Sequence, residues 1–130
     1  MSKRILIAGL LTSALALPAS AEGWSVIDFT SMPDIATCVS HAEAAIGVYS
    51  QTYPAPVDVV VAQSTIGAYG LRGNVVDGLF VCTEIAGLVA PMLVVHNSDD
   101  DTDARILIAD RLAEAWDAVA AGASPGAPKE

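Results

Sequence analysis

The chain has 130 residues, of which 53% are hydrophobic, and its formal net charge at pH 7 is −9. This charge repels phosphate backbones and anionic lipid surfaces, and the sequence contains no basic stripe. Composition therefore excludes nucleic acid as a partner. A chain of this length is expected to form a single domain around one core.

Residues 1–21 have the pattern of a signal peptide. Lys3 and Arg4 form the positive start, residues 5–17 are apolar, and small residues end the segment. The apolar run is shorter than the roughly 20 residues of a membrane-spanning helix. We therefore expect cleavage before Glu22, a periplasmic or secreted product, and no stable membrane anchor.

Cys38 and Cys82 are the two cysteines of the sequence. Their wide separation excludes a C-x-x-C redox motif. In an oxidising compartment, two such cysteines most often form one structural disulfide. We expect this bond to link the first helix to a strand.

Hydrophobic spacing predicts the order helix, strand, strand, strand, helix. The first helix begins with the capping pattern of residues 31–34, and prolines follow its end near Gln51. Alternating valines at 57–61 predict a strand, whereas residues 67–74 are predicted either to form a further strand or to remain a loop.

Residues 75–84 and 88–95 predict a hairpin with a tight turn at Ala86-Gly87. A second amphipathic helix is predicted from Ala104 to near Gly122, before a loose, disordered tail over 123–130. This order favours an α+β fold. Residues 22–122 would form one domain, with an antiparallel sheet and both helices packed on one face.

In general pattern the chain resembles small exported bacterial α+β domains of unknown function that carry two cysteines. The resemblance rests on Cys38, on the strands 78–82 and 92–95, and on the helix that holds Arg105 and Arg111. It implies a cysteine in the first helix, a second one late in a strand, a hairpin and a closing helix. It implies no catalytic residues.

Both faces of the predicted sheet are apolar, although one face of an antiparallel sheet is usually polar and exposed to water. Alternation places Cys82 toward the helices, so the opposite side chains of both hairpin strands are predicted to form an interaction face: Val75, Leu79, Val81, Val89, Leu93 and Val95. Another copy of the chain, another periplasmic protein or an apolar ligand could cover this face. The alternative is an internal cover, formed by residues 22–29 or 67–74.

Two groups of side chains invite a metal-site interpretation. Asp99, Asp101 and Asp103 have part of the spacing of a calcium loop, but Ala104 stands where such loops need glycine. The favoured interpretation is that this segment caps the second helix, with Ser98 or Asp101 accepting backbone N–H groups and the other aspartates stabilised by the helix dipole.

The other group would bind copper through His41, His96 and Met92. These residues come from separate predicted elements, and structural roles are the favoured reading of both histidines.

No catalytic triad order, zinc protease motif or phosphate loop occurs in the sequence. The sequence therefore predicts a non-catalytic exported binding or accessory module that acts through protein association. A periplasmic metal-binding protein, with calcium or copper as the ion, is the alternative hypothesis.

Overall fold

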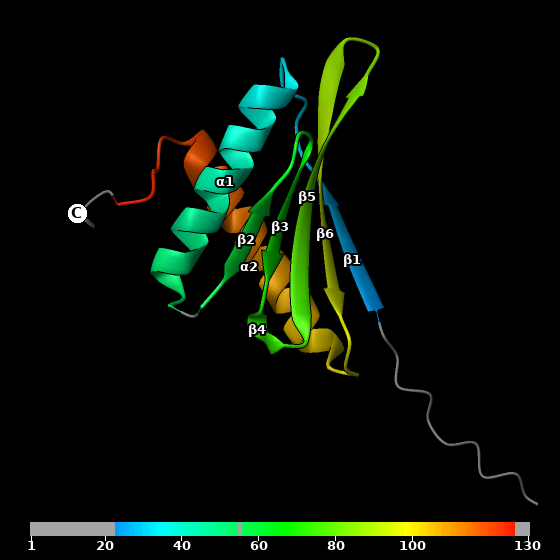
Figure 1. Ribbon diagram of the computed structural model, residues 1–130, viewed down its shortest axis with the longest axis vertical. Coiled ribbons are helices and arrows are strands. Elements are labelled where there is room, and N and C mark those ends of the chain that lie inside the picture. The colour runs from blue at the N-terminus through cyan, green and yellow to red at the C-terminus, as the bar shows by residue number, and fades with distance from the viewer. Residues whose placement is uncertain (1–22, 55, 127–130) are drawn as a thin grey trace, which may run out of the picture.

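The computed structural model describes residues 23–54 and 56–126, which form an α+β fold with one disulfide (Figure 1). Within this range, five strands form a sheet in the order β1-β6-β5-β3-β2, and all paired neighbours are antiparallel. The elements are β1 (Gly23–Asp28), α1 (Ile35–Thr52), β2 (Asp58–Val61), β3 (Thr65–Tyr69), β4 (Leu71–Asn74), β5 (Val76–Ile85), β6 (Leu88–Asn97) and α2 (Thr102–Ala120).

The sheet is larger than the three strands predicted from the sequence. β1 adds an edge strand next to β6, and the glycine-rich stretch 67–74 is divided between β3 and the short β4. The predicted signal peptide, residues 1–21, and its cleavage point before Glu22 lie outside the described residues. In the described part of the chain, no helix is both long and apolar enough to cross a membrane.

The β5–β6 hairpin is the central unit of the sheet. Its two-residue turn has Ala86 at φ 51° and Gly87 at φ 80°, the left-handed geometry that matches the twist of paired strands. The turn pairs Ile85 with Leu88, and the ladder continues to Val76 opposite Asn97. The predicted hairpin and its turn are confirmed.

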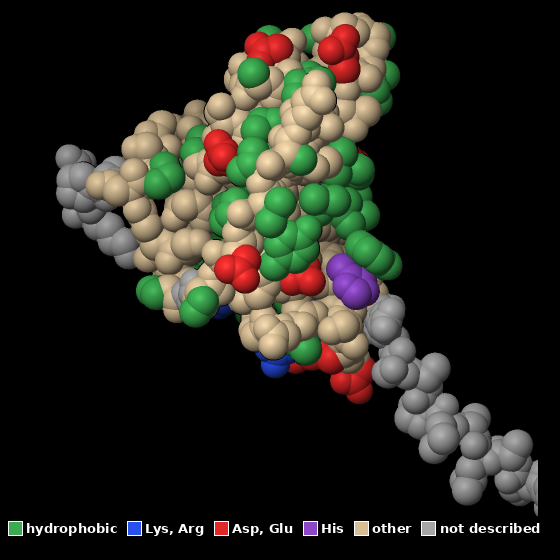
Figure 2. Space-filling model, in the orientation of Figure 1, with side chains coloured by type: hydrophobic (Ala, Val, Ile, Leu, Met, Phe, Trp, Pro, Cys, Tyr) green, Lys and Arg blue, Asp and Glu red, His purple; other side chains and the backbone are tan. Residues whose placement is uncertain are grey.

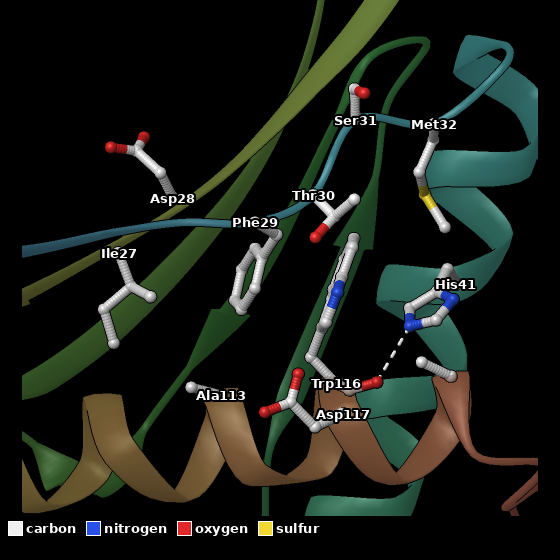
Figure 3. A pocket seen from close by; sticks show the side chains of 11 residues that line it. Ile27, Asp28, Phe29, Thr30, Ser31, Met32, His41, Ala113, Trp116 and Asp117 are labelled. Carbon is white, nitrogen blue, oxygen red and sulfur yellow. Dashed lines mark hydrogen bonds between the residues drawn. The ribbon is translucent and has the colours of Figure 1, made fainter.

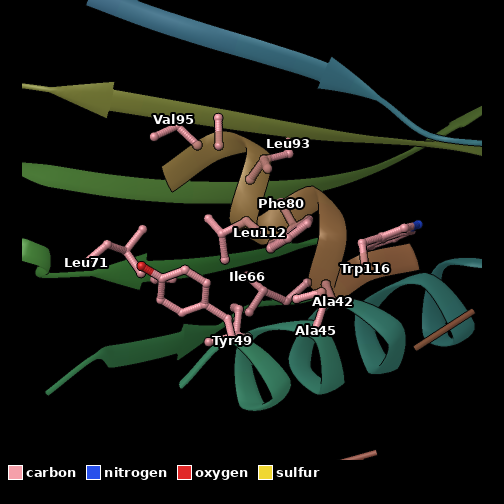
Figure 4. Packing of buried hydrophobic residues seen from close by; sticks show 14 of the residues in the cluster. Ala42, Ala45, Tyr49, Ile66, Leu71, Phe80, Leu93, Val95, Leu112 and Trp116 are labelled. Carbon is pink, nitrogen blue, oxygen red and sulfur yellow. The ribbon is translucent and has the colours of Figure 1, made fainter. Parts of the chain in front are cut away.

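Both helices pack on one face of the sheet, where the hydrophobic core lies (Figure 4). Phe80 of β5 and Leu93 of β6 are paired in register and point together toward the helices. Trp116 of α2 stacks on Phe80 and on Phe29, with ring centroids 5.4 and 4.4 Å apart. The core therefore joins α2 to the hairpin and to the segment after β1.

α1 begins later than the sequence pattern predicted. Asp34 is its N-cap, and the Asp34 carboxylate accepts a hydrogen bond of 2.7 Å from the Thr37 N–H. That bond holds the pKa of Asp34 below its usual value. Ser31 is not the cap. The next residue, Met32, forms a backbone bridge with Val89 of β6, so the chain is still extended there.

The predicted Cys38–Cys82 disulfide is present, with an S–S distance of 2.04 Å. Cys38 lies on the buried face of α1, and Cys82 lies on the helix-facing side of β5. The bond therefore clamps the first helix to the middle strand of the sheet.

One residue of the predicted loose tail, Pro125, lies against α1. The Ala123 N–H donates to the Ala118 carbonyl at 2.9 Å, and a Cβ added at Gly47 would meet the Pro125 ring at 2.6 Å. The prolyl ring thus lies in the space that Gly47 leaves, while residues 124–126 remain exposed. Residues 127–130 lie outside the described range.

Reduction of the disulfide should destabilise the domain strongly. The cysteines are 44 residues apart, and closing a loop of that length restricts the unfolded chain by roughly 4 kcal/mol in the entropic treatment. We expect reductant to lower the free energy of unfolding of the wild-type protein by about this amount in urea titrations. The C38A/C82A variant serves as the control and should not respond to reductant; equal stability of reduced and oxidised wild type would contradict the prediction.

Candidate functional site: the open face of the sheet

The face of the sheet opposite the helices is apolar in the described structure. Side chains alternate along each strand, so the residues between the core positions point away from α1 and α2. We call this surface the open face and define it by eight side chains: Trp24, Val26, Val60, Tyr69, Leu79, Val81, Met92 and Val94.

The outer strands contribute the most exposed side chains of the open face. Trp24 is 66% exposed, Val26 57% and Val60 56%. Figure 2 shows hydrophobic side chains gathered over the sheet, beside one histidine. Leu79, Val81, Met92 and Val94 are half-buried between them, so the patch is continuous across the sheet.

Tyr69 lies flat over β3. A Cβ added at Gly67 would stand 2.6 Å from Cε2 of the Tyr69 ring, so only glycine leaves room for the ring there. The tyrosine thus covers the backbone of its own strand, and its ring adds a large apolar surface to the open face.

The charged side chains on the open face are acidic. Asp28, Asp58 and Asp77 occupy outward positions of β1, β2 and β5, and no lysine or arginine lies in these sheet strands. Asp77 also accepts a hydrogen bond of 3.0 Å from the Gly70 N–H. The face therefore combines an apolar middle with aspartates near its ends.

The sequence prediction of this face is correct on β5 but wrong on β6. Leu79 and Val81 point outward as predicted, whereas Val89, Leu93 and Val95 are fully buried toward the helices. The two-residue turn decides this, because it pairs Phe80 with Leu93, and directly paired residues share a face.

Val75 is also misplaced in the prediction. It lies in the turn before β5, where side chains do not alternate between the two faces of the sheet, and it packs against the core. The outward residues of β6 are instead Met92 and Val94. The tight turn in the sequence could have identified these two residues, because a two-residue loop fixes the register of a hairpin and directly paired residues share a face.

The predicted internal covers do not lie across this face. Instead of crossing the sheet, residues 23–28 pair with β6 as an edge strand, from Gly23 opposite Asn97 to Asp28 opposite Met92. This pairing sends Ile27 into the core and leaves Trp24 and Val26 outward. The segment expected to hide the apolar face enlarges it.

The predicted calcium residues are held in a turn around a buried amide. Asn97 is fully buried, and its Nδ2 donates to the Asp99 carbonyl at 2.7 Å and to Asp99 Oδ1 at 2.8 Å. Its Oδ1 accepts from Arg105 at 2.7 Å. The turn between β6 and α2 is therefore organised by hydrogen bonds within the protein.

Asp101 is the N-cap of α2, as the capping interpretation predicted. One carboxylate oxygen accepts from the Ala104 N–H at 2.9 Å, and the other accepts from Arg72 at 2.6 Å. These two contacts hold the pKa of Asp101 below its usual value. Asp103 lies in the first turn of the helix, where a negative charge favours the helix dipole.

His41 lies at a cavity of about 430 Å³ between the loop after β1 and the two helices (Figure 3). Its Nε2 is 2.9 Å from the Trp116 carbonyl oxygen, which can only accept, so Nε2 is the donor. The imidazole ring also packs on the Trp116 indole, with centroids 4.1 Å apart. His41 therefore fastens α1 to the C-terminal half of α2.

The three predicted copper ligands do not meet. His41 lies on the helix side, whereas Met92 and His96 are on the open face, where the His96 ring packs at a tilt against Trp24 with 4.3 Å between centroids. Four residues of strand separate Met92 from His96 by about 13 Å. Across residues 23–54 and 56–126, no group of three or more His, Cys, Asp or Glu is placed to hold a metal ion.

Comparison with protein-family models, with curated proteins and with solved structures found no match to this chain. The functional argument therefore rests on the geometry of the described residues.

Removal of the Asp101 cap should lower stability in a pH-dependent way. A carboxylate whose pKa is depressed by folding stabilises the protein above its unfolded pKa, and this contribution is lost as the pH falls through the folded value. We expect D101A to lower the melting temperature at neutral pH, with the difference from wild type shrinking below about pH 4. Thermal unfolding followed by circular dichroism checks this.

D103A is the matched control, since Asp103 lies on the same turn and does not serve as the cap. Its effect at neutral pH should be smaller than that of D101A. A D101A deficit that is the same at neutral and acidic pH would contradict the role of the ionised cap.

Proposed function

We propose that this protein is a non-catalytic exported binding module, and that its open face docks on another protein whose apolar surface is bordered by lysine or arginine. The observation that supports this function is a continuous apolar patch on the sheet, with Trp24 66% exposed near one edge. Soluble proteins rarely expose a large apolar patch unless it serves an interaction. Full burial of an exposed valine or leucine is favourable by about 1.5 to 3 kcal/mol, and burial of the half-buried ones contributes proportionally less.

The dimensions of the open face suit a stable interface. Strands are about 4.8 Å apart and rise about 3.4 Å per residue, so the face is about 20 Å wide and about 30 Å long beside β5. That surface is of the same order as the roughly 800 Å² per partner in a standard complex. Trp24 and Tyr69 belong to the residue types that contribute most binding energy at interfaces.

Charge favours a different protein over a second copy of this chain. The open face carries Asp28, Asp58 and Asp77 without a lysine or arginine, and the whole chain has a net charge of −9. Two copies packed face to face would bring these carboxylates together, whereas a basic border on the partner would pair with them. We therefore expect the open face to bind a different protein and not a second copy of this chain.

The V26E substitution should weaken binding of the partner by at least about tenfold. It removes the burial of a valine that is 57% exposed on the edge strand β1 and places a charge on the apolar patch, and a loss of about 1.4 kcal/mol already corresponds to tenfold. The partner is first identified by a photoreactive side chain at position 26 in the exporting cell. Its dissociation constant is then measured with purified proteins.

I106E is the matched control, because Ile106 is 46% exposed on α2, belongs to no strand of the sheet, and acquires the same charge. It should leave the dissociation constant unchanged, and a photoreactive side chain at position 106 should not capture the same protein. Added salt should slow association of the wild type. Concentration-dependent dimers of the wild type that V26E abolishes would replace the proposed partner with a second copy.

A further inference from the structure

A second, independent site lies on the helix side of the molecule. A cleft of about 470 Å³ opens between the C-terminal half of α1, the strand β4 and the N-terminal half of α2. Small-molecule sites usually have volumes of roughly 300 to 1,000 Å³. The residues that the argument uses are Tyr49, Leu71, Arg72, Leu107, Ile108 and Arg111.

Arg111 brings a positive charge to this cleft that no carboxylate neutralises in the described structure. Its guanidinium lies 4.1 Å from the centre of the Tyr53 ring, and among residues 23–54 and 56–126 it has no carboxylate oxygen within 4.0 Å. Arg72, by contrast, donates to Asp101 at 2.6 Å. Stacking on Tyr53 fixes the plane of the Arg111 guanidinium and leaves its N–H groups for another acceptor.

Tyr49 supplies a second donor. Only 3% of the residue is exposed, but its hydroxyl oxygen is not among the fully buried polar atoms and has no hydrogen-bond partner among the described residues. Figure 4 shows this hydroxyl pointing toward Leu71, which also lines the cleft. Burial raises the pKa of Tyr49 against the opposing charge of Arg111, so the hydroxyl keeps its proton at neutral pH. A hydroxyl at the wall of a cleft, with no partner among the described residues, is free to donate a hydrogen bond to a ligand.

The remainder of the lining is apolar. Leu71 and Ile108 are buried beneath the cleft, while Leu107 is 48% exposed at its border. We propose that this cleft binds a small organic monocarboxylate, with its carboxylate held by Arg111 and the Tyr49 hydroxyl and its apolar body packed on Leu71, Leu107 and Ile108. Arginine binds carboxylates through two parallel N–H bonds, which suits an acceptor with two oxygens.

The other charges at the cleft define the ligand class further. Asp101 and Asp103 also line it, but both oxygens of Asp101 accept hydrogen bonds from the protein. Asp103 adds a negative charge that opposes a dianion such as a phosphate monoester. Arg111 in turn opposes a cation. A single negative charge on an apolar body is therefore the ligand that these groups accommodate best.

Titration of the oxidised wild-type protein with 4-phenylbutyrate tests the proposal. Calorimetry and amide chemical shifts should show one site, with shifts concentrated at residues of α1, β4 and α2 that border the cleft. The neutral 4-phenylbutyramide should bind at least about tenfold more weakly, since it lacks the charge that Arg111 attracts. Phenyl phosphate should also bind more weakly than the carboxylate.

Two variants separate the roles of the two donors. Y49F removes only the hydroxyl and should weaken 4-phenylbutyrate binding about tenfold. R111Q should weaken it by at least tenfold, and R111K should fall between R111Q and wild type because lysine keeps the charge but loses the paired N–H geometry. Q63E is the matched control for R111Q, since Gln63 is exposed in the β2–β3 turn and the change also lowers the net charge by one.

Several results would overturn the proposal. One is that the wild type does not bind 4-phenylbutyrate, or binds the carboxylate and the amide with equal affinity. Another is that Y49F keeps both its melting temperature and the wild-type affinity for 4-phenylbutyrate. A third is that Q63E and R111Q lose that affinity to the same extent. Because the cleft lies on the helix side, V26E should leave this binding unchanged. The result is therefore independent of the proposed function of the open face.

Discussion

The ladder between β5 and β6 determines which side chains enter the core and which remain outside. Its two-residue turn pairs Ile85 with Leu88, and the same register brings Phe80 opposite Leu93 under the helices. A shift of one residue would move every side chain of a strand to the other face. Because β1 and β3 pair with this hairpin on either side, its register also orients their side chains.

The disulfide adds a covalent constraint to that ladder. Cys82 lies on the same side of β5 as Phe80, so its bond to Cys38 holds α1 over the core face. α2 joins the same layer through Trp116, which stacks on Phe80 and lies against His41 of α1. Both helices lie on one side, so no element formed by residues 23–54 and 56–126 covers the opposite face of the sheet. The apolar open face is the direct consequence of this one-sided packing.

The two proposed binding surfaces depend on different features of this arrangement. The open face depends on the sheet, where apolar side chains lie beside aspartates and the five paired strands contain no lysine or arginine. The cleft depends on the meeting of α1, β4 and α2, which places Tyr49 and Arg111 together although they are far apart in the chain. An acidic domain can thus present an apolar surface to a protein on one side and, on the other, a cleft in which Arg111 is left to bind a small carboxylate.

The sequence by itself determined the α+β class, the disulfide and the hairpin, because each follows from local spacing or from the two cysteines, and it reduced the cap of the second helix to Ser98 or Asp101. It also indicated an apolar second face and identified Leu79 and Val81 on it. Only the tertiary structure decided that Trp24 and Val26 belong to that face, since the strand that holds them pairs with β6 instead of crossing the sheet. The cleft at Arg111 was equally beyond the sequence, because long-range packing of α1 against α2 brings its donors together, and no local pattern of residues encodes that contact.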